Sequence, residues 1–311
     1  MYSYLRSKDF ILRNARPLDI ARWYYLFEGG NRDDVLKTLK AYQNIDGGFA
    51  HALEPDCWNT RSTPLQTWVA TRIIREVHLE DKKHPMILDI LNYLASGAEF
   101  DGHRWNGLST VASNNEYPHA PWWSYTQTQE SSYNPTASLI GFILKYAEKD
   151  SNLYLFACNL AQEAYSYFKD HFPLDSMHEA ACYVELYEYI KNTDHTKRHE
   201  LYHLINLEHF KNLLQQQIKH LITYHTDSWL TDYVCKPSLF IADRSSDFYA
   251  DNKDICHFEC QFIKEHQNKD GTWNVAWNWD AYPNEWAISK NWWQSDIIIN
   301  NLKYLKAFEL A

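Results

Sequence analysis

Two short stretches of this chain share one pattern, QNIDGGF at residues 43–49 and QNKDGTW at residues 267–273. Both read Gln-Asn, a variable residue, Asp-Gly, a second variable residue and an aromatic, and each follows a segment with helical periodicity. Asp-Gly favours a tight turn because glycine accepts backbone angles that other residues avoid. Such internal similarity is typical of repeat architectures. The pattern therefore predicts an array of helical hairpins.

Helical periodicity extends along most of the chain, while strand-like alternation is scarce. Apolar stripes predict about ten or eleven helices. Asn31 is the expected N-cap of one of them and Gly97 the C-terminal stop of another, while Asn134-Pro135 reads as a cap followed by a first-turn proline. The predicted helical ranges are 17–28, 31–43, 62–78, 84–96, 134–147, 151–170, 176–191, 206–224, 252–266 and about 295 onward. The expected class is all-α.

Weaker copies of the repeated phrase lie between the two clear ones. Residues 94–105 end in FDGHRW, and residues 224–229 end in TDSW. In each, an Asp and a small residue precede an aromatic that can bury about 150–250 Å² against a neighbouring hairpin. The simplest interpretation of the phrase is structural, with the aromatic joining one hairpin to the next.

The amino-acid composition limits the classes of function that we expect for this chain. The chain has 311 residues, a formal charge of −10 and 13 Trp, with no Pro-rich or Gly/Ser-rich linker, so we expect one domain over 1–311. An acidic balance argues against nucleic acid and anionic membranes as partners. We find no apolar run of about 18 residues that would span a membrane and no signal peptide. Six irregularly spaced Cys do not form a disulfide framework, so the expected compartment is the cytoplasm.

The spacing Gln-x-x-x-Gly-x-aromatic resembles the repeat of terpenoid cyclases and protein prenyltransferases. Residues 14–19, 27–30 and 42–56 are similar to a group of stand-alone bacterial proteins in the same superfamily. The resemblance is specific for residues 14–68 and roughly 261–308. It implies an α/α toroid of about five to six helical hairpins around a central cavity. A small-molecule ligand, isoprenoid or oligosaccharide, would occupy that cavity.

The motifs that carry the chemistry of these families are missing. The sequence has neither the Asp-x-Asp-Asp of protonating cyclases nor the Asp-Asp-x-x-Asp of ionising ones. Asp254-Ile255-Cys256 matches half of the prenyltransferase zinc motif, but residues 290–300 contain no His to complete it. We therefore predict no metal site, and the sequence identifies no cofactor.

The best candidate for chemistry is the loop after the first phrase, which carries His51, Glu54 and Asp56 beside Pro55. A carboxylate next to an imidazole can act as an acid–base pair, and the three could also ligate a metal. His103 follows a similar turn and is the fourth catalytic candidate. In a toroid these loops rim the cavity. Alternatively, the carboxylates cap the next helix and the histidine bonds to the backbone.

Aromatic side chains supply the candidate ligand site. Several lie in the long connection at 101–133, a length typical of functional loops, which we expect to be a lid or a cavity wall. Trp faces suit sugar rings and cationic intermediates, although each could equally wedge two hairpins together. The ligand-binding candidates are Trp58, Trp105, Trp122, Trp123, Trp277, Trp279 and Asp280.

Three functions remain open. The first is an isoprenoid-binding toroid enzyme without an assigned reaction, and the second is a carbohydrate-active lyase or glycosidase on the same fold. The third is a non-catalytic repeat scaffold. An apolar wall with one buried acid would favour isoprenoids, and paired carboxylates in an open cleft would favour glycans.

Overall fold

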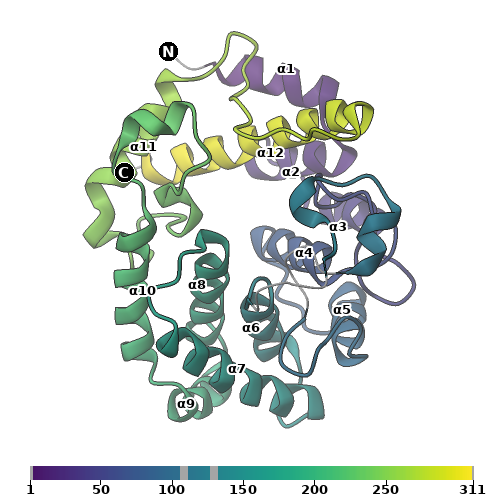
Figure 1. Cartoon of the computed structure of the whole chain (residues 1–311), viewed down its shortest axis with the longest axis vertical. Helices are drawn as coiled ribbons and strands as arrows, with labels where there is room; N and C mark the ends of the chain where they lie inside the picture. The colour runs from purple at the N-terminus through teal and green to yellow at the C-terminus, as the bar shows by residue number, and fades with distance from the viewer. Residues whose placement is uncertain (1–2, 106–110, 127–131, 310–311) are drawn as a thin grey trace. The chain divides into compact units, whose positions relative to one another are not determined.

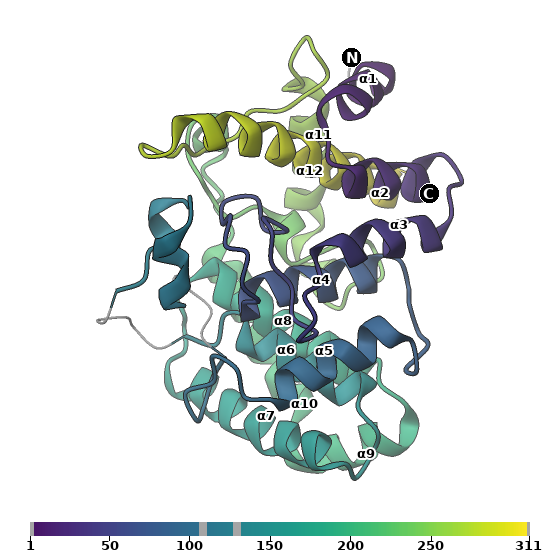
Figure 2. The same cartoon turned by 90° about the vertical axis from the view of Figure 1, so that its right-hand side faces the viewer.

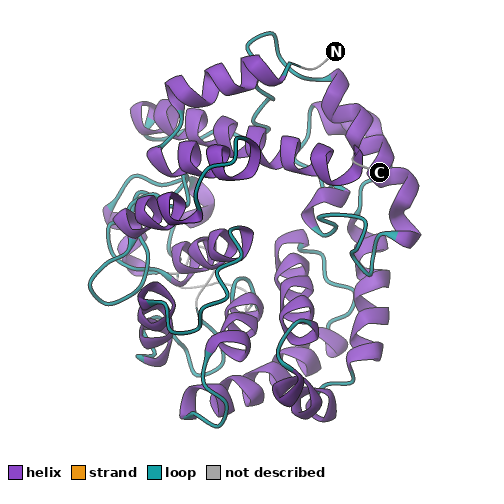
Figure 3. Cartoon of the chain, turned by 180° about the vertical axis from the view of Figure 1, so that it is seen from behind, coloured by secondary structure: helices purple, strands orange, loops and turns teal. Residues whose placement is uncertain are grey.

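The computed structural model describes residues 3–105, 111–126 and 132–309. In these ranges the chain forms twelve α-helices joined by loops and short 3-10 helices, with isolated bridges and no strand (Figure 3). The all-α prediction is thus confirmed for the part of the chain described. None of these helices combines the length and apolar character that a membrane crossing requires. Residue contacts divide the chain into two compact units, unit 1 (1–41 and 222–311) and unit 2 (42–221).

Unit 1 combines segments that are far apart in sequence. Its helices are α1 (Tyr4–Asn14), α2 (Pro17–Phe27), α3 (Arg32–Leu39), α11 (Lys253–Glu265) and α12 (Pro283–Glu309). Short 3-10 helices occupy Lys40–Tyr42, at the junction with unit 2, and Thr226–Leu230, Pro237–Leu239 and Ala250–Asn252. Helix α12 packs against α1, α2 and α11, so the N-terminal and C-terminal segments share one core (Figure 2).

Unit 2 is built around two buried helices. Its helices are α4 (Pro64–Glu76), α5 (Pro85–Ala95), α6 (Thr136–Tyr146), α7 (Asn152–Asp170), α8 (Met177–Lys191), α9 (His195–Leu204) and α10 (Leu207–Leu221). Helix α6 contacts α4, α7 and α8, and α8 also contacts α9 and α10 (Figure 1). Gly141 permits the close approach of α6 to α8, because a Cβ there would lie 2.5 Å from the Tyr189 ring. The 3-10 helices of unit 2 are Ala112–Glu116 and Pro121–Trp123.

Several predicted helix ends are confirmed. Asn31 caps α3 by accepting a hydrogen bond from the Asp33 N–H at 2.9 Å. Gly97, two residues beyond the end of α5, has a φ of 73°, the left-handed angle of a helix stop. The prediction for Asn134-Pro135 is wrong in detail, because α6 begins at Thr136 and Pro135 precedes it.

Three helices differ from prediction. Helix α12 begins at Pro283 rather than near 295, because its first turns carry no regular apolar stripe to reveal them. Helices α1 and α9 have no counterpart among the predicted ranges. Each buries only two of its residues, Ser7 and Ile11 in α1 and Lys197 and Leu201 in α9.

The two copies of the repeated phrase form the same turn. Gln43 Nε2 donates to the Gly47 carbonyl at 2.9 Å, and Gln267 Nε2 donates to the Gly271 carbonyl at 3.1 Å. The backbone N–H of Asn44 donates to the carbonyl of residue 48, as that of Asn268 donates to the carbonyl of residue 272. The phrase therefore encodes one local structure twice, once in each unit.

The Asp-Gly pair explains why this turn needs these residue types. Asp46 Oδ1 accepts from the backbone N–H two residues on at 3.0 Å, and Asp270 Oδ1 does the same at 3.1 Å. Gly47 and Gly271 have φ angles of 89° and 91°. A Cβ on Gly47 would lie 2.1 Å from the carbonyl oxygen of Asp89 in α5. Each turn thus lets its glycine touch the backbone of a neighbouring helix.

The second turn also holds the N-terminal helix. A Cβ on Gly271 would lie 2.4 Å from the backbone of Arg6 and Ser7 in α1. Ser7 Oγ donates to the Gly271 carbonyl at 2.7 Å, and Gln267 Oε1 accepts from the Ser3 N–H at 2.6 Å. Gln267 thus satisfies a backbone group at the N-terminal end of α1. The aromatics Phe49 and Trp273 are buried in their own units as expected.

The weaker copies differ from each other. At 101–105, Asp101 Oδ1 accepts from the His103 N–H at 2.8 Å and Gly102 has a φ of 106°, so the Asp-Gly device is kept. Residues 226–230 instead form a 3-10 helix. There the buried Trp229 donates from Nε1 to the Thr223 carbonyl at 2.8 Å.

A buried lysine fixes α9 to the end of α6. Lys197 is 2% exposed, and its Nζ donates to the carbonyl oxygens of Leu144 and Ala147 at 3.1 and 2.5 Å. The last carbonyls of a helix lack intrahelical partners, so an ammonium group placed there satisfies them. Burial lowers the pKa of Lys197 to about 8. This contact turns the face of α9 that carries Lys197 and Leu201 inward.

Candidate functional site

The loop predicted to carry chemistry, residues 50–59, bends sharply at two consecutive residues. His51 and Ala52 have φ angles of 62° and 57°, which L-residues rarely adopt. The Leu53 N–H donates to Gln66 Oε1 at 2.9 Å, which ties the loop to the first turn of α4. Backbone strain of this kind persists only where the surrounding structure enforces it.

The two carboxylates of this loop lie inside unit 2. Glu54 is 7% exposed and Asp56 2% exposed. Glu54 Oε2 accepts from the Asp56 N–H at 2.9 Å, and the Asp56 carbonyl accepts from the Ala120 N–H at 2.8 Å. The Glu54 carboxylate thus serves the local backbone, but the N-cap of α4 is Thr63, so the alternative in which these carboxylates cap the next helix is not confirmed.

The long connection packs on the same loop. Residues 106–110 and 127–131 of the predicted 101–133 segment lie outside the described residues. In the rest, Asn59 Nδ2 donates to Ser113 Oγ at 2.7 Å and to Asn114 Oδ1 at 2.9 Å. The His119 ring bonds to Ser124 Oγ at 2.9 Å through Nε2. Its described part is thus joined to the 50–59 loop by buried and part-buried side-chain hydrogen bonds of Asn59.

The two predicted catalytic histidines have different partners. His51 Nε2 hydrogen-bonds with Asn44 Oδ1 at 2.9 Å, within the repeated turn. His103 Nδ1 lies 2.7 Å from Glu163 Oε1 of α7, and both side chains are largely exposed. A site shared by His51 and His103 therefore stays a prediction.

Two of the four candidate tryptophans of unit 2 are core residues. Trp105 is 1% exposed and packs on Phe100 with ring centroids 4.9 Å apart. Trp123 is also buried and Trp58 half-buried, whereas Trp122 is 41% exposed. Trp122 is thus the most exposed of these four.

The remaining candidates belong to unit 1. Trp277 is half-buried and packs edge-on against Tyr233 and Trp293, with centroids 5.3 and 5.0 Å away. Trp279 is buried, and Asp280 next to it is exposed. The structure places these side chains in a different unit from the 50–59 loop.

Helices α4 and α8 carry a charged cluster that lies outside the predicted site. Its centre is Glu185, whose side chain is only 8% exposed. Its carboxylate accepts from Trp68 Nε1 at 3.0 Å, from Arg72 Nε at 3.2 Å and from an Arg75 guanidinium nitrogen at 3.3 Å. Ser138 Oγ of α6 donates a further hydrogen bond. We call Trp68, Arg72, Arg75, His178 and Glu185 the α4–α8 cluster.

The partners of Glu185 keep it ionised. Burial alone would raise the pKa of this carboxyl, but the charges of Arg75 and Arg72 and the hydrogen bonds from Ser138 and Trp68 outweigh burial and lower it. A buried carboxylate with this many donors is held in one orientation. It can therefore position the two guanidinium groups beside it.

Two members of the cluster are partly exposed to solvent. The Arg72 side chain is 50% exposed, and its guanidinium lies 5.0 Å from the centre of the Trp68 ring. Burial and the charge of Arg72 lower the pKa of the half-buried His178. His178 is therefore a neutral imidazole at pH 7 within electrostatic range of a cation. That combination can bind an anionic group and accept a proton close to it.

One sequence signal points to this cluster. Glu185 interrupts the apolar run AACYVELY at residues 180–187. A carboxylate in such a run requires buried partners, because isolated charges are rarely placed in a core. The arginines of α4 supply them, but the pairing is non-local and does not show in the periodicity.

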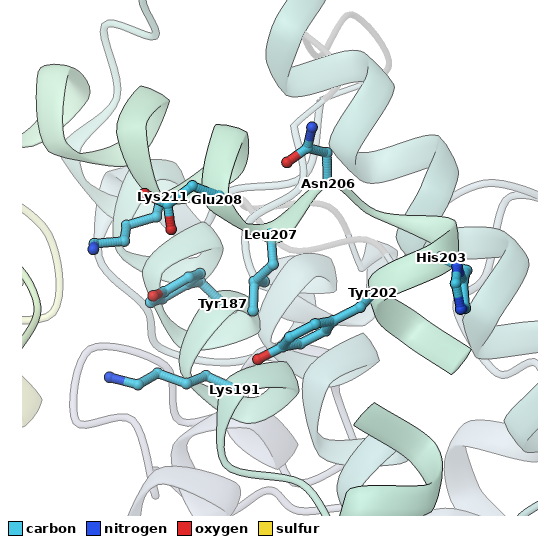
Figure 4. A pocket seen from close by; sticks show the side chains of 8 residues that line it. All are labelled: Tyr187, Lys191, Tyr202, His203, Asn206, Leu207, Glu208 and Lys211. Atoms are coloured by element: carbon cyan, nitrogen blue, oxygen red, sulfur yellow. The ribbon is translucent and has the colours of Figure 1, made fainter. Parts of the chain in front are cut away.

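Two hollows open on unit 2. The larger measures about 480 Å³ and lies among α8, α9 and α10 (Figure 4). Its lining side chains are Tyr187, Lys191, Tyr202, His203, Asn206, Leu207, Glu208 and Lys211. The smaller measures about 320 Å³ and lies beside the exposed ion pair of Arg61 and Glu116. None of the predicted catalytic or ligand-binding residues lines either hollow.

Unit 1 contains a buried acid of its own. Glu259 of α11 is 2% exposed and accepts from Ser238 through the backbone N–H at 2.8 Å and Oγ at 2.5 Å. Burial raises its pKa to about 7, although the bonds from Ser238 and the charge of Lys236 act in the opposite direction. This carboxyl changes its charge near neutral pH without reaching solvent.

The raised pKa of Glu259 predicts a pH-dependent stability. The folded chain holds this proton more tightly than the unfolded chain, so the free energy of unfolding should fall as pH rises from about 4.5 to about 7. A pKa raised from 4.5 to about 7 corresponds to roughly 3 kcal/mol. In urea unfolding at a series of pH values, the neutral variant Glu259→Gln should lack this part of the pH dependence of the unfolding free energy. Glu265→Gln, on the exposed side of the same helix, is the matched control and should keep it.

Neither a metal cluster nor a known relative adds to these candidates. In the described ranges, no three or more His, Cys, Asp or Glu side chains are grouped to hold a metal ion, and all six cysteines are buried. No protein-family model, curated protein or solved structure matches the chain.

Proposed function

We propose that this chain is an enzyme that acts on an acidic, hydroxyl-rich ligand of the carbohydrate type at the α4–α8 cluster. The observation that carries the proposal is the half-exposed Arg72, fixed by an ionised Glu185 and lying on Trp68. The neutral His178 lies on the same helix as Glu185, and its pKa is lowered by the charge of Arg72. A guanidinium binds a carboxylate, and an indole ring offers a flat apolar face for a sugar ring.

The reaction class that suits these groups is proton abstraction next to a carboxylate. Arg72 would neutralise the carboxylate of an acidic sugar, which makes the adjacent C–H more acidic. His178 would take that proton, the electron pair of the C–H bond would form a C=C bond, and the C–O bond to the leaving sugar would break. The leaving oxygen would then be protonated by the His178 imidazolium or by water. This is the lyase form of the carbohydrate-active alternative.

The polar character of the cluster favours this alternative over an isoprenoid ligand. Two carboxylates, Glu185 and Glu188, and two arginines, Arg72 and Arg75, lie together there. An isoprenoid site would need apolar and aromatic walls. The isoprenoid hypothesis and the scaffold hypothesis both remain open proposals.

For the architecture, we propose that the helical hairpins form an α/α toroid, as in terpenoid cyclases and protein prenyltransferases. The proposal is supported by the repeated Gln-Asn-x-Asp-Gly turn, which has the same hydrogen bonds in both units. Small-angle scattering that fits an open superhelix and excludes a closed ring would count against it.

An assay of β-elimination tests the function. Uronate-containing oligosaccharides should raise the melting temperature and yield an unsaturated product detected by ultraviolet absorbance. His178→Gln should lower kcat by about 10²–10⁴-fold with little change in KM. Arg72→Gln should raise KM, because it removes the partner of the carboxylate. Because the pKa of His178 is lowered, activity should fall only below about pH 6.5.

Matched variants separate catalysis from folding. Arg61→Gln removes an exposed ion pair elsewhere in unit 2 and should leave activity unchanged. If prenyl diphosphates or neutral oligosaccharides stabilise the protein while uronates have no effect, the assignment is wrong. The same holds if His178→Gln retains full activity on a cleaved uronate.

A further inference from the structure

Helix α9 presents histidines at every fourth position on its outer face. His195, His199 and His203 are all exposed. Residues four apart lie on the same face of a helix, so these imidazoles form a row. The rings of His199 and His203 are in contact, with centroids 4.7 Å apart and planes at 73°.

This spacing suits chelation of one metal ion. Two imidazoles bound to one zinc ion at about 2.0 Å have ring centroids roughly 5 Å apart. The pair on α9 thus needs only small side-chain rotations to direct one nitrogen of each ring at a common point. The same i, i+4 spacing on a helix places both histidines on the metal in the His-Glu-x-x-His motif.

The helix itself is held from the opposite side. Lys197 and Leu201 are buried and anchor α9 against the rest of unit 2, so the histidine face is turned away from the core. The ammonium of Lys197 is engaged with carbonyl oxygens at the end of α6 and is directed away from that face. A metal ion bound to His199 and His203 therefore meets no buried positive charge from this lysine.

We propose that His199 and His203 form a binding site for a borderline transition-metal ion such as Zn²⁺, Ni²⁺ or Cu²⁺. Imidazole nitrogen suits these ions, whereas Mg²⁺ and Ca²⁺ prefer oxygen ligands. Two protein ligands leave the other coordination positions to water or to a ligand. His203 also lines the larger hollow, where it stands apart from the other seven side chains (Figure 4). The proposed metal site thus adjoins that hollow through His203.

The neighbouring His195 predicts a distinctive order of metal affinities among the variants. His199 can pair with His203 and also with His195, because it lies four residues from each. His199→Gln removes both pairs and should abolish binding. His203→Gln leaves the His195 and His199 pair, so weaker binding should remain. Loss of a ligand should cost at least the roughly 10–100-fold that loss of an outer-shell partner costs.

Calorimetric titration of the chelator-treated full chain with ZnCl₂, NiCl₂, CuCl₂ and MgCl₂ tests the site. We expect one ion per chain for the first three salts and no binding of Mg²⁺. His225→Gln, an exposed histidine of unit 1, is the control and should bind like the unmodified chain. Circular dichroism verifies that each variant is folded, and electron paramagnetic resonance of bound Cu²⁺ should show coupling to imidazole nitrogen.

Three results would overturn the proposal. The unmodified chain could fail to bind Zn²⁺, Ni²⁺ and Cu²⁺. The double variant His199→Gln/His203→Gln could retain the affinity of the unmodified chain, which would locate the ion elsewhere. His225→Gln could lower the affinity as much as His199→Gln.

Discussion

Replacing Gly47 with alanine should destabilise the protein by at least about 3 kcal/mol, the largest effect that we expect from any single added methyl group. Two costs add together. The φ of 89° at Gly47 is unfavourable for any residue with a Cβ, and that Cβ would lie 2.1 Å from the Asp89 carbonyl oxygen. A backbone atom cannot rotate away, so the turn or α5 has to shift. Gly271→Ala should destabilise unit 1 in the same way, because its Cβ would lie 2.4 Å from backbone atoms of Arg6 and Ser7.

The chain offers a matched control for this effect. Gly97 has a φ of 73°, but no atom lies within 4 Å of the position that a Cβ would take there. Gly97→Ala should therefore carry only the cost of the unfavourable backbone angle, about 1 kcal/mol. Urea unfolding followed by circular dichroism gives the free energies of unfolding of Gly47→Ala, Gly271→Ala and Gly97→Ala. Equal losses in Gly47→Ala and Gly97→Ala would mean that close approach to α5 does not matter.

Asp19→Asn should cost about 3–5 kcal/mol, because it leaves two buried cations without their shared counter-ion. Asp19 of α2 is fully buried and lies 2.7 Å from Arg16 Nε and 3.3 Å from an Arg22 guanidinium nitrogen. Arg22 also pairs with Asp296 of α12 at 2.8 Å. The network joins the first and last thirds of the sequence inside unit 1, so its loss should loosen α2 from α12.

The measurement is again urea unfolding, with Asp9→Asn as the control. Asp9 is exposed on α1, and its neutralisation should change the free energy of unfolding by less than about 0.5 kcal/mol. A double-mutant cycle with Asp19→Asn and Arg22→Met isolates the pair. A coupling energy near zero would show that Asp19 does not hold Arg22 in place.

The helical class was predictable because it rests on local information. The Asp-Gly turns, the cap at Asn31 and the stop at Gly97 are set by a few neighbouring residues. Helix α9 was not predictable from periodicity because its sequence, HTKRHELYHL, has almost no apolar stripe. Its signal was the Asp194 cap, which accepts from the Lys197 N–H, and a buried lysine whose partners are carbonyls of another helix.

The candidate site was less predictable because charge pairing is non-local. The sequence places His51, Glu54 and Asp56 in one loop, but only the fold shows that both carboxylates are buried there. Glu185 and Arg72 lie more than a hundred positions apart, and no periodicity connects them. The contact is visible only when α4 and α8 are placed side by side in unit 2.

Unit 1 combines two segments that are far apart in the sequence, and this has a consequence for synthesis on the ribosome. Helices α1 and α2 leave the ribosome before unit 2, yet their packing partner α12 is made only after residue 282. Unit 2 has all its residues once position 221 has emerged. The early helices must therefore wait with apolar faces uncovered while the middle of the chain folds, a state in which chaperones commonly engage nascent proteins.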